Sequence, residues 1–245
     1  MIPIILLTLL MVTGAPQVQA ADGVETPAPE VPAAVRIAVI DDIPVTRAAV
    51  AIMTTAYQQL GITMSTYTAP SNRALRLANS GELDGDLFRV ESVAADYPNL
   101  IPVGYPLLAG FLYAVVLETG ADTLPKPEGR PLRVGIRRGV ILAEQAAASL
   151  NMEPLLADDF RQLRRLLEWG RVDLILVADV EGISPLHNPQ WQGLHRISEP
   201  VTAFSLYHYV NRRHANLAPA LAEVLRAMHD RGNTARILQQ ARAAQ

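Results

Sequence analysis

Polar side chains stand at or near the ends of three segments whose composition predicts buried strands. They are Asp41 and Asp42 after the first strand, Tyr67 at the end of the second, and Asp86 and Arg89 at the end of the third. Open parallel sheets bind ligands beyond the carboxyl ends of their strands. The guanidinium of Arg89 presents a fork of donors that matches a carboxylate and stays charged at any relevant pH. These residues predict a site for a small charged solute, with Arg89 as its leading contact.

Arg89 also has an explanation that involves no ligand. Charged residues at strand ends are usually solvated or paired. Asp86 and Glu91 both lie close to Arg89 in the sequence. An intramolecular ion pair with one of them is an equal alternative.

A second position for an anion lies in the turn Arg137–Val140, which precedes a predicted helix. The free N–H groups and the dipole of a helix start favour negative charge, here at Gly139 and Val140. An ordinary strand-to-helix turn is the alternative.

Other reactive chemistry is not indicated. The sequence holds no cysteine, nucleophile elbow, phosphate-binding glycine loop or His-Glu-x-x-His motif. His208 and His214 are explained by alternate strand positions and a helix start better than by a metal. We therefore predict no catalytic residue, no metal site and no cofactor.

Strands and helices alternate from Val35 onward, and this order predicts an α/β fold built on mostly parallel sheets. The predicted strands are 35–40, 62–67, 83–90, 132–136, 155–156, 172–177 and 203–210. The predicted helices are 49–60 ending at Gly61, 71–81 capped by Ser71, 139–150, one capped by Asp158 that buries Phe160 and Leu163, and 217–228.

The first 34 residues predict export. Ile2–Val12 is an apolar run of signal-peptide length, and Val18-Gln19-Ala20 offers the small residues that a signal peptidase accepts, so cleavage is expected after Ala20. A single-pass anchor is the weaker alternative, because the run is shorter than a bilayer span. Residues 21–34 contain three prolines among small and acidic residues and predict a disordered leader.

Composition narrows the class of partner. Half of the 245 residues are hydrophobic, which excludes a disordered chain, and the formal net charge of −3 with scattered arginines argues against a nucleic-acid surface. A small molecule is the expected partner of a soluble, periplasmic protein.

Two long segments carry a resemblance to a known family. Arg73–Leu107, with the sequence RALRLANSGELDGDLFRVESVAADYPNLIPVGYPL, and Pro200–Gly232 together with the export signal resemble the bacterial extracellular solute-binding proteins of family 3. The resemblance implies a two-lobed clamp of the type II periplasmic-binding-protein fold. Lobe 1 would comprise 35–118 and 201–245, lobe 2 would comprise 119–200, and a two-segment hinge would cross near Glu118 and Pro200.

The same resemblance implies a function. Such a protein captures an amino acid or related carboxylate in the interlobe cleft and, as a monomer, delivers it to the permease of an ABC transporter. Family members place after the strand 172–177 an aspartate that accepts the ligand ammonium group, which points to Asp179, with a helix cap as the alternative.

This sequence departs from the family pattern at three places. The Thr-Pro-Glu-Arg-like loop is missing, Val140 replaces the usual hydroxyl residue, and Asp179 is six positions after Asp173 instead of five. Three alternatives therefore stay open: a ligand sensor for a membrane receptor, a ligand-free interaction module, and a dehydratase-type enzyme on the same scaffold.

Overall fold

The structure, a computed structural model, describes residues 31–40, 43–117 and 122–244. The predicted signal peptide, the site candidates Asp41 and Asp42, and the hinge crossing near Glu118 lie outside these residues. The predicted lobe boundaries therefore stay predictions.

The first half of the structure is a mixed sheet in the order β2-β1-β3-β10, and β4 also pairs with β10. β1 is parallel to β2 and β3, and β10 is antiparallel to β3 and β4. The strands are β1 Ala34–Ile40, β2 Thr63–Ala69, β3 Gly85–Arg89, β4 Leu100–Pro102 and β10 Thr202–Asn211.

The second half repeats this plan in the order β5-β8-β6-β7, and β9 pairs with β5. β6 is parallel to β7 and β8, and β5 is antiparallel to β8. The strands are β5 Leu108–Val116, β6 Arg133–Arg137, β7 Glu153–Ala157, β8 Leu174–Val180 and β9 His195–Arg196.

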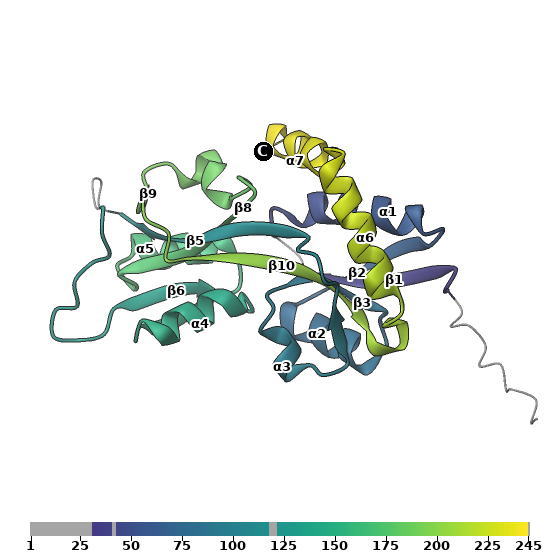
Figure 1. Cartoon of the computed structure of the whole chain (residues 1–245). Helices are drawn as coiled ribbons and strands as arrows, with labels where there is room; N and C mark the ends of the chain where they lie inside the picture. Colours follow the sequence, from purple (N-terminus) through teal and green to yellow (C-terminus); the bar gives the residue numbers. More distant parts are fainter. Residues whose placement is uncertain (1–30, 41–42, 118–121, 245) are drawn as a thin grey trace, which may run out of the picture. The chain divides into compact units, whose positions relative to one another are not determined.

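Helices cover both faces of each half (Figure 1). The first half carries α1 Thr46–Gln59, α6 Leu217–Asp230 and α7 Asn233–Ala243 over one core, and α2 Ser71–Ser80 and α3 Val93–Asp96 over another. The second half carries α4 Ile141–Ser149 on one core and α5 Phe160–Glu168 on the other, with the short helices η1 Pro185–His187 and η2 Pro189–Trp191; η3 Arg212–His214 follows β10.

Two long antiparallel strands, β5 and β10, join the halves (Figure 1). The first part of β10, Thr202–Leu206, pairs with β5, whereas its later residues pair with β3 and β4. This arrangement is the predicted two-lobed α/β clamp with a return strand from the C-terminal segment.

The helix caps differ from two predictions. Ser71 is the first residue of α2, not its cap, and makes no capping hydrogen bond. The cap of α5 is Asp159, whose side chain accepts from the backbone N–H of Gln162, whereas Asp158 pairs with Arg138 at 2.8 Å. In both cases the cap lies one residue from the one expected, with Pro70 at the N-cap position of α2.

His208 is buried at an irregularity of β10. The register against β3 shifts between Tyr207 and Tyr209, and the His208 ring between them is 0% exposed. Its Nδ1 lies 3.1 Å from the carbonyl oxygen of Leu87 and its Nε2 lies 2.8 Å from the hydroxyl of Tyr57. Since a carbonyl only accepts, Nδ1 carries the proton, and Nε2 accepts from Tyr57. The imidazole is therefore held neutral, and burial lowers its pKa to about 4.

We expect this histidine to make folding pH-dependent. The unfolded chain takes up a proton near the ordinary pKa of 6.5, whereas the folded protein does not until about pH 4. The free energy of unfolding therefore falls as the pH drops from 6.5 to 4, by roughly 3 kcal/mol in all. Urea unfolding at a series of pH values should show this slope, and His208→Gln should flatten it.

The exposed His229 provides the control. His229→Gln should leave the slope unchanged. A His208→Gln protein with the wild-type slope would contradict the assignment of the neutral buried imidazole.

Candidate functional site

Arg89 stands at the end of the central strand β3 and is almost completely buried. It is 4% exposed, and its Nε and Nη2 donate to the two carboxylate oxygens of Asp86 at 2.9 and 2.8 Å, in a pair whose aspartate is 1% exposed. Burial raises the pKa of Asp86, and the Arg89 guanidinium opposes that shift. The ion pair that the sequence offered as an alternative is present, and it lies in the protein interior.

Ser71 connects this pair to the other lobe. Arg89 Nη1 donates to Ser71 Oγ at 2.6 Å, and Nη2 donates to the Ser71 carbonyl oxygen at 3.2 Å. Ser71 Oγ in turn donates to the carbonyl oxygen of Gly139 at 2.8 Å. A single buried hydroxyl thus links β3 of lobe 1 to the turn before α4 of lobe 2. Sequence reasoning missed this role because it treated Ser71 as a helix cap.

Gly139 is required where the two lobes touch. Its φ is +80°, and a Cβ at this position would lie 2.4 Å from the Cβ of Ser71. Its backbone N–H donates to Glu144 Oε1 at 3.1 Å. One backbone N–H of the turn that was predicted to bind an anion is therefore already bonded to a side chain of α4.

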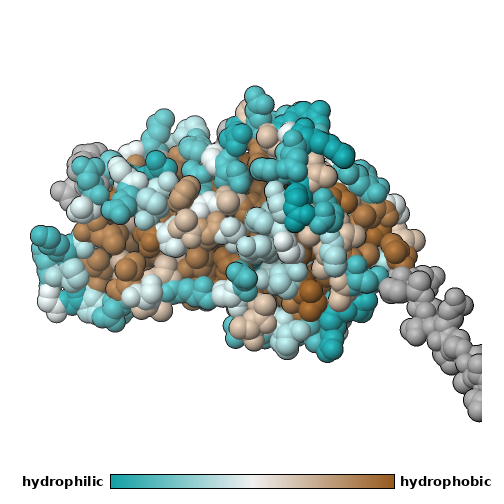
Figure 2. Space-filling view, viewed as in Figure 1, coloured by the Kyte–Doolittle hydropathy of each residue, from teal (hydrophilic) through white to brown (hydrophobic). Residues whose placement is uncertain are grey.

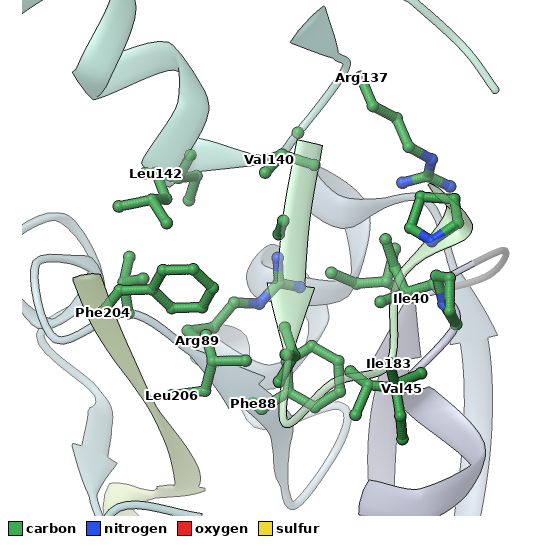
Figure 3. Close-up of a pocket in the computed structure, with 18 of the residues that line it drawn as sticks. Ile40, Val45, Phe88, Arg89, Arg137, Val140, Leu142, Ile183, Phe204 and Leu206 are labelled. Atoms are coloured by element: carbon green, nitrogen blue, oxygen red, sulfur yellow. The ribbon is translucent and has the colours of Figure 1, made fainter. Parts of the chain in front are cut away.

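A cavity of about 110 Å³ lies beside this contact, lined from both lobes (Figure 3). Its polar wall includes Arg89 and Arg137. The remaining wall is largely apolar and includes Ile40, Phe88, Val140, Ile183, Phe204 and Leu206. In Figure 3 the Arg89 guanidinium reaches between Phe204 and Ile40. Arg137 is 8% exposed, and its guanidinium carbon lies 5.5 Å from the centroid of the Phe160 ring.

A larger groove of about 1080 Å³ shares part of this wall, including Arg137, Gly139 and Phe160. Its other residues are more polar and include Asn72, Arg138 and Arg161. The groove therefore adjoins the apolar cavity at these shared residues.

Asp179 does not line the cavity. The prediction that it follows its strand is also wrong. β8 runs on to Val180, so Asp179 lies inside the strand opposite Phe111 and caps no helix. Successive strand residues face opposite sides. Leu176, Ala178 and Val180 therefore line the cavity, whereas Asp179 lines a separate open groove.

Tyr67 is also displaced from its predicted place. β2 extends to Ala69, so Tyr67 does not end the strand. Its ring lies under the guanidinium of Arg36, whose carbon is 4.6 Å from the ring centroid, and Tyr67 is absent from the walls of the cavity and of the larger groove. Of the predicted ligand contacts within the described residues, Arg89, Gly139 and Val140 line the cavity, and Asp86 lies directly behind Arg89.

Figure 2 shows apolar side chains gathered over the region of β5 and β10, between hydrophilic rims. Within residues 31–40, 43–117 and 122–244, no group of three histidine or acidic residues is arranged to hold a metal ion. No helix in that same part of the chain is both long and apolar enough to cross a membrane.

No model of a protein family matches the chain. An uncharacterized protein of Shewanella oneidensis is 28% identical over 202 residues, which cover 79% of this chain and 75% of that protein.

Solved structures resemble the chain over most of its length. The GluR0 ligand-binding core in complex with L-glutamate has a TM-score of 0.70 and 12% identity, covering 84% of this chain and 97% of that one. Tv2483 bound to L-arginine has a TM-score of 0.67 and 17% identity, covering 85% and 90%. These similarities agree with the lobes, the crossing strands and the sequence resemblance described above. The chain therefore has the type II periplasmic-binding-protein fold of the family 3 solute-binding proteins that its sequence resembles.

Proposed function

We propose that this protein is a periplasmic solute-binding protein that captures a small carboxylate-bearing solute between its lobes and presents the closed form to a membrane permease. The observation that carries the proposal is the cavity lined by both lobes, with the buried Arg89 in its wall. A buried guanidinium beside an apolar cavity suits recognition of a carboxylate better than general-acid chemistry, which needs a positioned proton donor.

Closure follows from how the cavity is built. A ligand shifts an equilibrium between open and closed forms only if it binds one form more tightly. Here one wall comes from β1, β3 and β10 and the other from β6, β8 and the start of α4. A solute in the cavity therefore gains its full set of contacts only when Ser71 meets Gly139.

Gly139→Ala tests this coupling. The added Cβ would clash with Ser71 only when the lobes meet, whereas the strain of a positive φ is present in both forms. We expect a larger radius of gyration in small-angle scattering with solute present, and at least a tenfold loss of solute affinity.

Gly104→Ala is the matched control, because Gly104 is exposed and no atom lies within 4 Å of a Cβ at that position. It should close and bind as the wild type does. Wild-type closure in Gly139→Ala would contradict the assignment of this contact to the closed form.

A ligand screen tests binding itself. Thermal unfolding should be followed with amino acids, small carboxylates, polyamines and cyclic acids. A solute at 100 times its Kd stabilises by about 2.7 kcal/mol, which raises Tm by roughly 5–11 °C for a protein of this size. Ala178→Leu, which fills the cavity from β8, should abolish the shift, and the exposed Ala203→Leu should retain it.

Arg89→Ala is a poor probe of the same site. Removing one partner of a buried ion pair costs about 3–5 kcal/mol, because it leaves Asp86 charged and unpaired. Loss of folding would then resemble loss of binding.

A panel with no stabilising solute would contradict the proposal and favour the ligand-free interaction module.

Export is tested separately. Mass spectrometry of the protein from the periplasmic fraction should give an N-terminus at Ala21, since Ala20 supplies the small residue before the cleavage point. Ala20→Arg should leave the uncleaved precursor, whereas Gln19→Arg should still be processed. A chain that begins at Met1 in the cytosolic fraction would contradict export.

A further inference from the structure

We infer that the cavity selects a small apolar monocarboxylate and rejects the α-amino acid that carries the same side chain. This inference rests on the proposed function and specifies the solute class of the same site. It departs from the amino-acid ligands implied by the family resemblance.

The first support is the composition of the wall. The described residues that line the cavity include two charged side chains, Arg89 and Arg137, and both are cationic. No aspartate or glutamate is among them. An ammonium group placed here would lie beside the Arg89 guanidinium and hydrocarbon, and burial of an unpaired charge costs several kcal/mol.

Two acidic residues that the sequence predicted as ligand contacts, Asp86 and Asp179, are already paired or face away from the cavity. Both oxygens of Asp86 accept from Arg89, and Asp179 lies on the opposite side of β8 from Ala178. The carbonyl of Gly139 accepts from Ser71. Neither of these carboxylates, nor the Gly139 carbonyl, is therefore open to an α-ammonium group in the cavity.

The second support is the donor capacity on the same wall. A guanidinium has five N–H donors, and the bonds of Arg89 to Asp86 and Ser71 use four of them. One N–H of Nη1 thus has no acceptor among the residues that the structure describes. The first turn of α4 adds the backbone N–H groups of Ile141 and Leu142, which have no acceptor within the helix. A carboxylate satisfies such donors, and a neutral apolar molecule does not.

The third support is size and shape. The cavity of about 110 Å³ includes three phenylalanines in its wall, Phe88, Phe160 and Phe204, together with branched aliphatic side chains. A dry cavity of about 150 Å³ admits a molecule the size of benzene. The space therefore suits a branched chain of about four or five carbons, and a single ring only if the lobes part slightly.

Matched pairs of solutes test the inference on the unmodified protein. Each carboxylate is compared with the amino acid that differs only by the ammonium group: 3-methylbutanoate with valine, 4-methylpentanoate with leucine, and 3-phenylpropanoate with phenylalanine. Calorimetry should give at least tenfold tighter binding for the carboxylate in the best-fitting pair. The neutral 3-methylbutanamide should lose that affinity, because it lacks the anion that Arg89 recognises.

A substitution should invert the preference. Ala178→Asp places a carboxylate in the apolar wall, so it should weaken binding of the carboxylates and strengthen binding of the amino acids. The exposed Ala203→Asp should change neither affinity. If Ala178→Asp does not fold, the solute pairs still decide the question, because they need no variant.

The outcomes separate the two proposals. Amino acids that bind and close the protein as tightly as their carboxylate partners would overturn the inference and leave the solute-binding function intact. The same result is expected if Asp41 or Asp42, which lie outside the described residues, supplies an acceptor for the ammonium group. Closure by neither class, nor by any other solute of the thermal screen, would overturn the function together with the inference. Closure can be followed through the buried Trp191 after Trp169→Phe removes the exposed second tryptophan.

Discussion

The ion pair between Arg89 and Asp86 is the interaction on which the cleft depends. Both side chains are buried, so the pair needs further hydrogen bonds to offset the cost of removing two charges from water. Ser71 supplies two of those contacts and then donates to Gly139 across the cleft. The hydrogen bonds that stabilise the buried Arg89 guanidinium thus also connect the two lobes through Ser71 and Gly139, and they hold Arg89 in one wall of the cavity.

The crossing strands impose the second constraint. β10 must pair with β5 in one half and with β3 and β4 in the other. The register shift around His208 lies within this strand, and bulges re-aim side chains at such places. The imidazole is turned into the core between Tyr57 and Leu87, where it fastens β10 to α1 and β3. The strand that joins the lobes is thus anchored firmly in the first of them.

The cavity combines these constraints with an apolar wall. Burial of hydrocarbon supplies binding free energy in proportion to area, and a charge-assisted contact orients the ligand. A site with cationic donors and no described acidic side chain is suited to a solute with one end held by charge and the other by shape. The proposed preference for a carboxylate without an ammonium group follows from that asymmetry.

Local patterns in the chain were enough to predict the alternating strands and helices and the placement of Arg89 at a strand end, whereas the two-lobed fold was implied by the family resemblance and strand β5 was not predicted. Apolar periodicity and glycine positions are local properties, so they can be interpreted without tertiary contacts. These local patterns could not predict which side of a strand each side chain faces or which distant residue it contacts. β8 extends three residues beyond its predicted end, which places Asp179 within the strand, and Ser71 contacts partners 18 and 68 positions away. Long-range packing alone decides which strand face meets the cleft and which hydroxyl bridges it, because those contacts join segments that no local pattern relates.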